Sequence, residues 1–137
     1  MVGIGMGIAN VAVAGSENLH ISKAWVPATD GTGVDVPLLM TVKNDAAEPD
    51  ALIRVRCPFA NFAEKHIVDR GEGAPAMRAI PSIPIPASTT TELKPNGHHV
   101  MLLQTRQKLS DGETLTCAVV FQKAGSLETE VRVIPSP

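Results

Sequence analysis

Aromatic residues are scarce in this sequence of 137 residues, which has no tyrosine, one tryptophan and three phenylalanines. Proteins that bind single-stranded nucleic acid stack bases on aromatic side chains, and the sequence offers no such platform. The formal net charge is −2, and acidic and basic residues are interspersed without a block of five like charges. The charge pattern therefore gives no electrostatic case for binding nucleic acid or an anionic membrane.

Cysteine is also rare, with only Cys57 and Cys117 and no Cys-x-x-Cys pair, which excludes a metal site built from four thiolates. Each cysteine ends or lies inside a strand-like run. A disulfide between neighbouring strands is one interpretation, and two separately buried small side chains are the other. The sequence also lacks a Gly-x-Ser-x-Gly elbow, and its Gly-rich segment at residues 3–7 has no strand–turn–helix context. We therefore expect a binding protein rather than an enzyme.

The N-terminal segment, residues 1–14, is apolar and uncharged and ends in a small-x-small sequence followed by Gly15. This pattern fits the end of a secretory signal peptide, although the basic start of such a peptide is missing. The segment is too short and too rich in glycine for a transmembrane helix. We interpret residues 1–14 as the remnant of a signal peptide or as a flexible tail. Residues 15–137 are then a single extracytoplasmic domain.

Eleven prolines, eleven glycines and many short Val, Ile and Thr runs predict an all-β domain. The Pro-rich run at residues 80–88 belongs at a sheet edge or in an extended crossover, because proline donates no hydrogen bond to a ladder. Nine short strands suit a two-layer β-sandwich. We expect them at residues 19–25, 36–43, 50–57, 63–69, 76–80, 90–94, 98–104, 114–122 and 127–134.

Four candidate metal ligands follow the pattern H-x10-M-x21-H-x-M: His66, Met77, His99 and Met101. On a strand, His99 and Met101 project from the same face and His98 from the other. Two imidazoles and two thioethers favour Cu(I), since thioether sulfur is soft and neutral, whereas Zn²⁺ prefers thiolate or carboxylate in place of methionine. Taken singly, each methionine is more typical of a core gap-filler than of a ligand.

Several neighbouring residues have plainer interpretations. The carboxylates Glu64, Asp69 and Glu72 surround His66 in the sequence and could orient its imidazole, but an ordinary solvated loop is the favoured interpretation. His98 is expected to be solvated or packed on the sheet. A structural role is expected for His20, Met40 and Trp25.

The spacing of the four ligands, with the segment LKPNGHHVMLL at 93–103, resembles the PCuAC-type periplasmic copper chaperones that serve cytochrome c oxidase copper-centre assembly. The resemblance extends to residues 24–29, 41–55 and 84–95. It departs from the family at Asn96, where a glycine is expected, and at His98, where an aromatic residue is usual.

The resemblance implies a cupredoxin-like Greek-key β-sandwich or barrel of about eight to nine strands. It implies one Cu(I) bound by His66, Met77, His99 and Met101. The copper would be delivered by ligand exchange to a cytochrome c oxidase copper centre or its assembly factor, in the bacterial periplasm. We expect a monomer that binds no nucleic acid and does not insert into a membrane. The alternatives are copper sequestration for resistance, a redox protein cycling between Cu(I) and Cu(II), and an interaction module with no metal.

Overall fold

The computed structural model describes residues 16–69 and 76–135, so the N-terminal segment interpreted as a signal-peptide remnant lies outside the described residues. The described residues form a three-residue 3-10 turn, η2 (Ser16–Asn18), and ten strands. Within these two ranges, no helix is long and apolar enough to cross a membrane. The strands are β1 (Leu19–Pro27), β2 (Val36–Asn44), β3 (Asp50–Arg56), β4 (Ala60–Asp69), β5 (Ala76–Ala79), β6 (Ile83–Ile85), β7 (Thr89–Glu92), β8 (His99–Thr105), β9 (Thr114–Phe121) and β10 (Gly125–Ile134).

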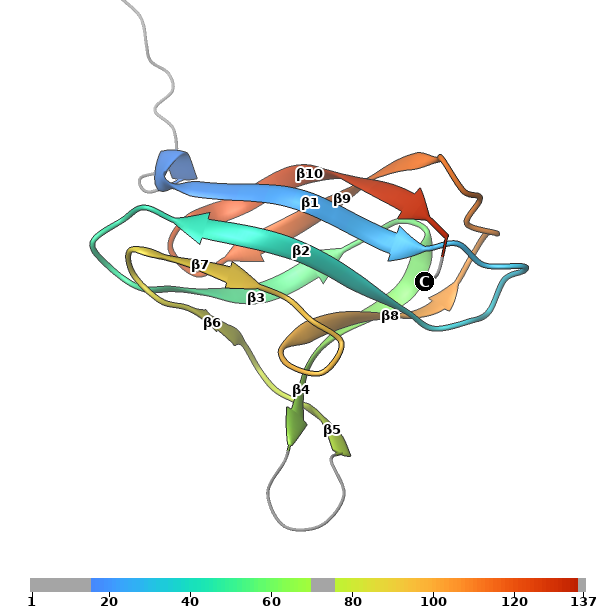
Figure 1. Ribbon diagram of the computed structural model, residues 1–137, viewed down its shortest axis with the longest axis horizontal. Coiled ribbons are helices and arrows are strands. Elements are labelled where there is room, and N and C mark those ends of the chain that lie inside the picture. Colours follow the sequence, from blue (N-terminus) through green and yellow to red (C-terminus); the bar gives the residue numbers. More distant parts are fainter. Residues whose placement is uncertain (1–15, 70–75, 136–137) are drawn as a thin grey trace, which may run out of the picture.

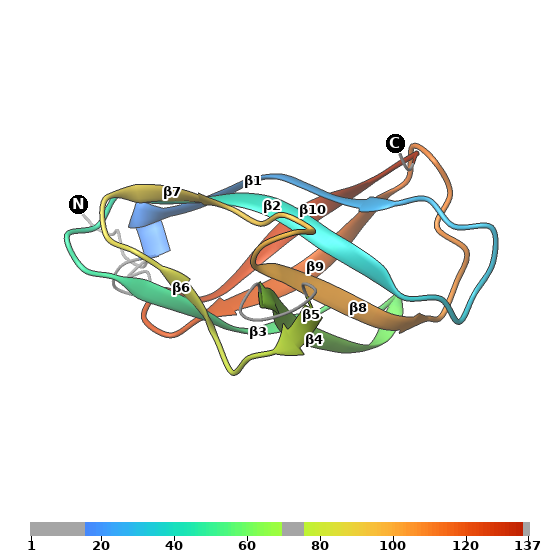
Figure 2. The ribbon, with the colours of Figure 1, turned by 60° about the horizontal axis from the view of Figure 1, so that its bottom comes forward.

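Hydrogen bonds connect the strands in the order β5-β4-β8-β2-β1-β10-β9-β3-β6, and β7 pairs with β2 beside this path. Most pairs are antiparallel, whereas β1 and β10 run parallel. The sheet folds over on itself (Figure 1), and Figure 2 shows β1, β2 and β7 along one side and β3, β4 and β6 along the other. The predicted all-β, cupredoxin-like fold is confirmed, with ten strands in one continuous sheet rather than eight or nine in two.

Strand β6 is the element that the sequence did not predict as a strand. It lies in the Pro-rich run, at the end of the sheet, and pairs with β3. Ile83 and Ile85 are fully buried, whereas Pro84 between them is exposed. A proline is tolerated here because an edge strand leaves one row of backbone groups without a partner strand. The prediction that this run belongs at an edge is confirmed.

Alternation of apolar and polar residues explains how the strands build the core. In β10, Val131 and Val133 are fully buried, whereas Glu130 and Arg132 are exposed. The core consists mainly of Val, Ile and Leu side chains, together with Phe59 and Phe121. Burial of each such side chain contributes about 1.5–3 kcal/mol, so a chain with few aromatics still obtains a stable core.

A disulfide joins Cys57, directly after β3, to Cys117 in β9, with the two Cα atoms 4.5 Å apart. These strands are hydrogen-bonded neighbours, and their ladder pairs Arg56 with Ala118. Of the two interpretations that the sequence left open, the disulfide between neighbouring strands is therefore correct.

Strand β4 is long enough to pair with β8 along its first part and with β5 at its end. The end of β4 and the short β5 project from the body of the sandwich (Figure 1). The start of β8 lies beside the base of this projection. Its first residue, His99, pairs with His66 of β4, and His66 is also the first residue of β4 that pairs with β5. Strands β4 and β5, which are close in the sequence, therefore meet the more distant β8 in one corner of the molecule.

Candidate metal centre

His66 lies at the junction of two ladders. It pairs with His99 as the last residue of the β4–β8 ladder and with Ala79 as the first residue of the β4–β5 ladder. Residues directly opposite each other in a ladder project from the same face of a sheet. Met77 pairs with Val68, which follows His66 by two residues and so shares its face. The register of three strands therefore turns both histidines and Met77 toward the same side.

The thioether sulfur of Met77 lies between the two imidazoles. It is 3.1 Å from Nδ1 of His66 and 3.2 Å from Nε2 of His99. The ring centroids of the two histidines are 5.5 Å apart, and the ring planes meet at 83°. Donor atoms that share one metal ion at bond lengths of about 2.0–2.3 Å lie roughly 3–4 Å from one another. The sulfur therefore stands at a suitable separation from each nitrogen for all three to bind one ion.

A hydrogen bond on the outer side of each ring fixes the position of the ring proton. Nε2 of His66 donates to Oε1 of Glu64 at 2.8 Å, and Nδ1 of His99 donates to the carbonyl oxygen of Gly97 at 3.1 Å. In a neutral imidazole, the other nitrogen then carries a free lone pair. Both lone pairs face the sulfur of Met77, which has no hydrogen of its own. Partners of this kind orient histidines that bind metals, so the donor set fits a soft cation.

The cluster is buried on one side and open on the other. His99 is 1% exposed and the side chain of His66 is 13% exposed, whereas Met77 is 53% exposed. Burial lowers the pKa of His99 below its ordinary value of 6.5, and positive charge on His66 and His98 lowers it further, while hydrogen bonds to backbone groups oppose the shift. His99 is therefore neutral near pH 7, which is the state that can bind a metal ion.

Met101 lies on the same face of β8 as His99, as predicted from their spacing. It is partly buried, pairs with Glu64 across the ladder, and is a diagonal neighbour of His66. Diagonal neighbours lie about 7–8 Å apart at the backbone, which long side chains can bridge. In the described part of the chain, the sulfur of Met101 makes no hydrogen-bond contact with the other three candidates. The fold therefore brings three of the four predicted ligands into contact and places the fourth beside them.

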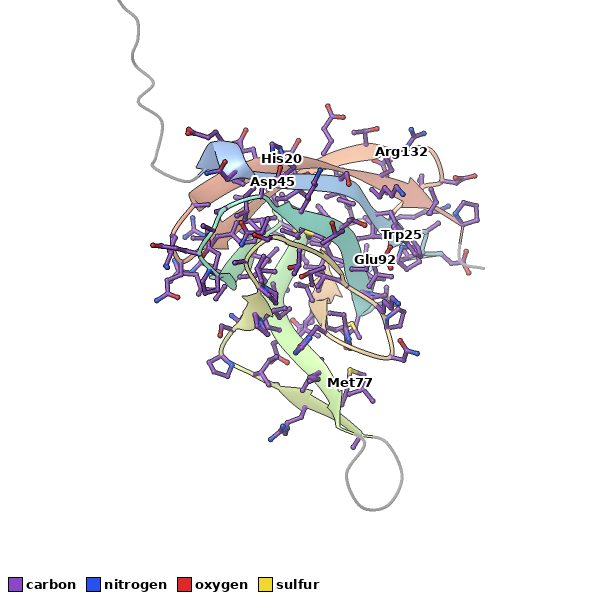
Figure 3. All side chains as sticks on the ribbon, turned by 60° about the vertical axis from the view of Figure 1, so that its left-hand side comes forward. His20, Trp25, Asp45, Met77, Glu92 and Arg132 are labelled. Atoms are coloured by element: carbon purple, nitrogen blue, oxygen red, sulfur yellow. A yellow bond between two sulfur atoms is a disulfide. The ribbon has the colours of Figure 1, made fainter. Side chains whose placement is uncertain are left out.

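Among the described residues, neither His98 nor His20 makes the contacts that join His66, Met77 and His99. His98 is partly buried, and the regular strand begins only at the next residue. His20 lies 3.4 Å from a carboxylate oxygen of Asp45, and Figure 3 shows this pair far from Met77. Met40 is buried in the core, and Trp25 packs against the core while partly exposed. These placements agree with the structural roles that we expected.

Glu64 combines the two interpretations that the sequence leaves open for the carboxylates near His66. Its side chain is 49% exposed, as in an ordinary solvated carboxylate, and it also contacts His66 at 2.8 Å. The signal was its position two residues before His66, since residues i and i+2 of a strand share a face. Asp69 ends β4, and Glu72 lies outside the described residues.

Solved structures with the same fold include two copper-related proteins. The copper-bound PCuAC domain from PmoF2 has a TM-score of 0.75 at 24% identity, over 87% of this chain and 94% of that domain. The Cu(I) form of DR1885 from Deinococcus radiodurans has a TM-score of 0.71 at 26% identity, over 90% of this chain and 85% of that one. The resemblance to PCuAC-type proteins is therefore confirmed.

The sequence is also similar to proteins that are named as putative lipoproteins. The protein named "Putative lipoprotein Lxx21020" from Leifsonia xyli subsp. xyli is 27% identical over 119 residues, which cover 86% of this chain and 70% of the relative. The names of this relative and of the two solved structures describe a putative lipoprotein and copper-bound proteins, and none of the three names an enzyme. The family model described as "Putative lipoprotein LpqE-like" matches residues 19–133, almost the whole described length. The chain therefore belongs to the LpqE-like family.

Proposed function

We propose that this protein is an extracytoplasmic Cu(I) carrier that holds one copper ion with Nδ1 of His66, the sulfur of Met77 and Nε2 of His99, with Met101 as a fourth ligand. The observation that carries the proposal is the position of the Met77 sulfur between two imidazole nitrogens whose lone pairs face it, at 3.1 and 3.2 Å. Imidazole and thioether donors together suit Cu(I) better than Zn²⁺, Mg²⁺ or Ca²⁺.

The sulfur chemistry of the chain supports this choice of metal and compartment. Both cysteines of the sequence are joined in one disulfide, so no free thiolate competes with the candidate site for Cu(I). Disulfides persist in oxidising compartments outside the cytoplasm, where a thioether ligand has the advantage that it does not form disulfides. The lipoprotein names in the family and the copper-related structures with the same fold point in the same direction.

The uneven exposure of the ligands suggests how copper would leave. Met77 lies at the open side of the cluster, whereas His99 is almost fully buried. A ligand from an acceptor protein would approach from the Met77 side and displace its thioether first, and His99 would release the ion last. The acceptor is a copper-binding protein, by resemblance a cytochrome c oxidase copper centre or its assembly factor. No bond in the protein backbone or in a substrate is broken, so the protein acts by ligand exchange and not by catalysis.

Competition with a coloured Cu(I) chelator under anaerobic conditions tests the site. We expect one Cu(I) per chain in the wild type and weaker binding in Met77→Leu and His99→Gln, which remove a donor atom while keeping a side chain of similar size. His20→Asn is the matched control, since His20 pairs with Asp45 away from the cluster. If both ligand variants retain wild-type affinity, the site assignment is wrong.

Transfer experiments separate delivery from the alternatives. Cu(I) should pass from the loaded protein to a soluble oxidase copper domain faster than it passes to the same domain from the Cu(I)–chelator complex. A sequestering protein would keep the ion in this assay. A redox protein would be revealed by reversible cycling of the bound ion between Cu(I) and Cu(II) without release.

A further inference from the structure

Glu64 is placed by the fold to control the orientation of one candidate copper ligand. It precedes His66 by two residues in β4 and therefore lies on the same face of the strand. Its carboxylate oxygen Oε1 accepts a hydrogen bond from Nε2 of His66 at 2.8 Å. The next residue, Lys65, donates instead to the backbone carbonyl of Ile53 at 2.7 Å. Glu64 and His66 thus form a local pair beside the cluster.

The identity of the protonated nitrogen decides whether His66 can bind a metal ion with Met77. A neutral imidazole carries its proton on either nitrogen, and a hydrogen-bond acceptor beside one nitrogen selects the form in which that nitrogen is protonated. The carboxylate of Glu64 accepts a hydrogen bond from Nε2–H of His66, so the proton stays on Nε2 and Nδ1 keeps its lone pair. Nδ1 is the atom that lies 3.1 Å from the sulfur of Met77.

The two histidines of the cluster achieve this selection by different means. His99 donates its Nδ1–H to the backbone carbonyl of Gly97, a group that every residue at position 97 would supply, and presents Nε2 to Met77. His66 presents Nδ1 to Met77 instead, and the position of its proton depends on the side chain of Glu64. A change at Glu64 can therefore release His66 while His99 keeps its orientation.

We infer that Glu64 is a positioning residue that selects Nδ1 of His66 as the copper-binding nitrogen. The inference rests on the proposed function for the identity of the metal. It does not need copper for its first consequence, the position of the proton on His66, because the hydrogen bond that sets it joins two side chains of the protein itself. Removal of the residue that orients a metal-binding histidine typically costs 10–100-fold in metal affinity.

Two variants and one control test this role. Glu64→Ala removes the acceptor, and Glu64→Gln keeps an oxygen that can accept from Nε2 of His66 without the negative charge. Glu92→Ala is the control, because Glu92 is also an exposed strand glutamate but pairs with Lys94, at 3.7 Å. The first measurement is ¹⁵N NMR of the histidine rings in metal-free protein near pH 7.5. The second is Cu(I) affinity by chelator competition at the same pH.

In the wild type and the Glu92→Ala control, we expect His66 to be protonated on Nε2. In Glu64→Ala, we expect a mixture of the two proton positions on His66, an unchanged His99 and a 10–100-fold weaker Cu(I) affinity. Glu64→Gln should keep most of the protonation of His66 on Nε2 and most of the wild-type Cu(I) affinity. The inference is overturned if His66 keeps its proton on Nε2 in Glu64→Ala, or if the proton position changes while Cu(I) affinity does not.

These outcomes are distinguishable from a failure of the proposed function. If the wild type itself binds no Cu(I), the copper carrier is excluded and the assignment of Nδ1 as a copper ligand is excluded with it. If the wild type binds Cu(I) through Met77 and His99 but Glu64→Ala binds equally well, the carrier remains and only the role of Glu64 is lost.

Discussion

The disulfide between Cys57 and Cys117 should contribute about 4 kcal/mol to the free energy of unfolding. The two residues are separated by 60 positions, and a cross-link of this span lowers the entropy of the unfolded chain by an amount worth about 4 kcal/mol at 25 °C. Reduction leaves the side chains in place and removes only the cross-link. We therefore expect the reduced wild-type protein to unfold at a much lower urea concentration than the oxidised protein.

Urea unfolding of metal-free protein, with and without a reductant, measures this difference. The variant in which both Cys57 and Cys117 are replaced by alanine is the control, since the reductant should leave its unfolding curve unchanged. A difference below about 1 kcal/mol between oxidised and reduced wild type would contradict the chain-entropy reasoning. It would mean that the reduced unfolded chain keeps residual structure, so that the cross-link removes little of its entropy.

The same bond affects how copper binding must be measured. Reduction would release two thiols, which are softer and stronger ligands for Cu(I) than thioethers. Ascorbate keeps copper as Cu(I) without supplying a thiol, so copper titrations should use it. Under these conditions we expect one Cu(I) per oxidised chain, and additional Cu(I) bound by the reduced chain.

Three other predictions follow from burial and charge. Met77→Ala should lower the free energy of unfolding by no more than about 1.5 kcal/mol, measured by urea unfolding, because the side chain is half exposed. Burial lowers the pKa of His99, so the unfolded chain takes up a proton near pH 6.5 before the native protein does. The free energy of unfolding of metal-free protein should therefore fall as the pH falls below about 6.5, and His99→Gln should reduce this dependence. Phe62 is 58% exposed and Phe121 is 1% exposed, so Phe121→Ala should cost about 3–5 kcal/mol and Phe62→Ala less than about 1 kcal/mol.

The sequence by itself determined most of the strands, β6 excepted, and much of the copper hypothesis. Alternation in β10, from Leu127 to Val133, has a local cause, since successive side chains of a strand point to opposite faces. The shared face of His99 and Met101 has the same cause. The four-ligand spacing and its resemblance to copper chaperones added the choice of metal, a hypothesis that the three assembled donors support.

Only the tertiary structure decided which distant residues meet. The sequence gives no reason for Met77 to lie between His66 and His99, because their contact depends on how β5 and β8 are aligned along β4. Burial of Val100 and Leu102, which are fully enclosed in the core, fixes the alignment of β8. A slip by one residue would turn these two outward and the ligands of β8 inward. Cys57 lies beside Cys117 for a similar reason, because the alignment of β3 with β9 is set by packing of the whole core.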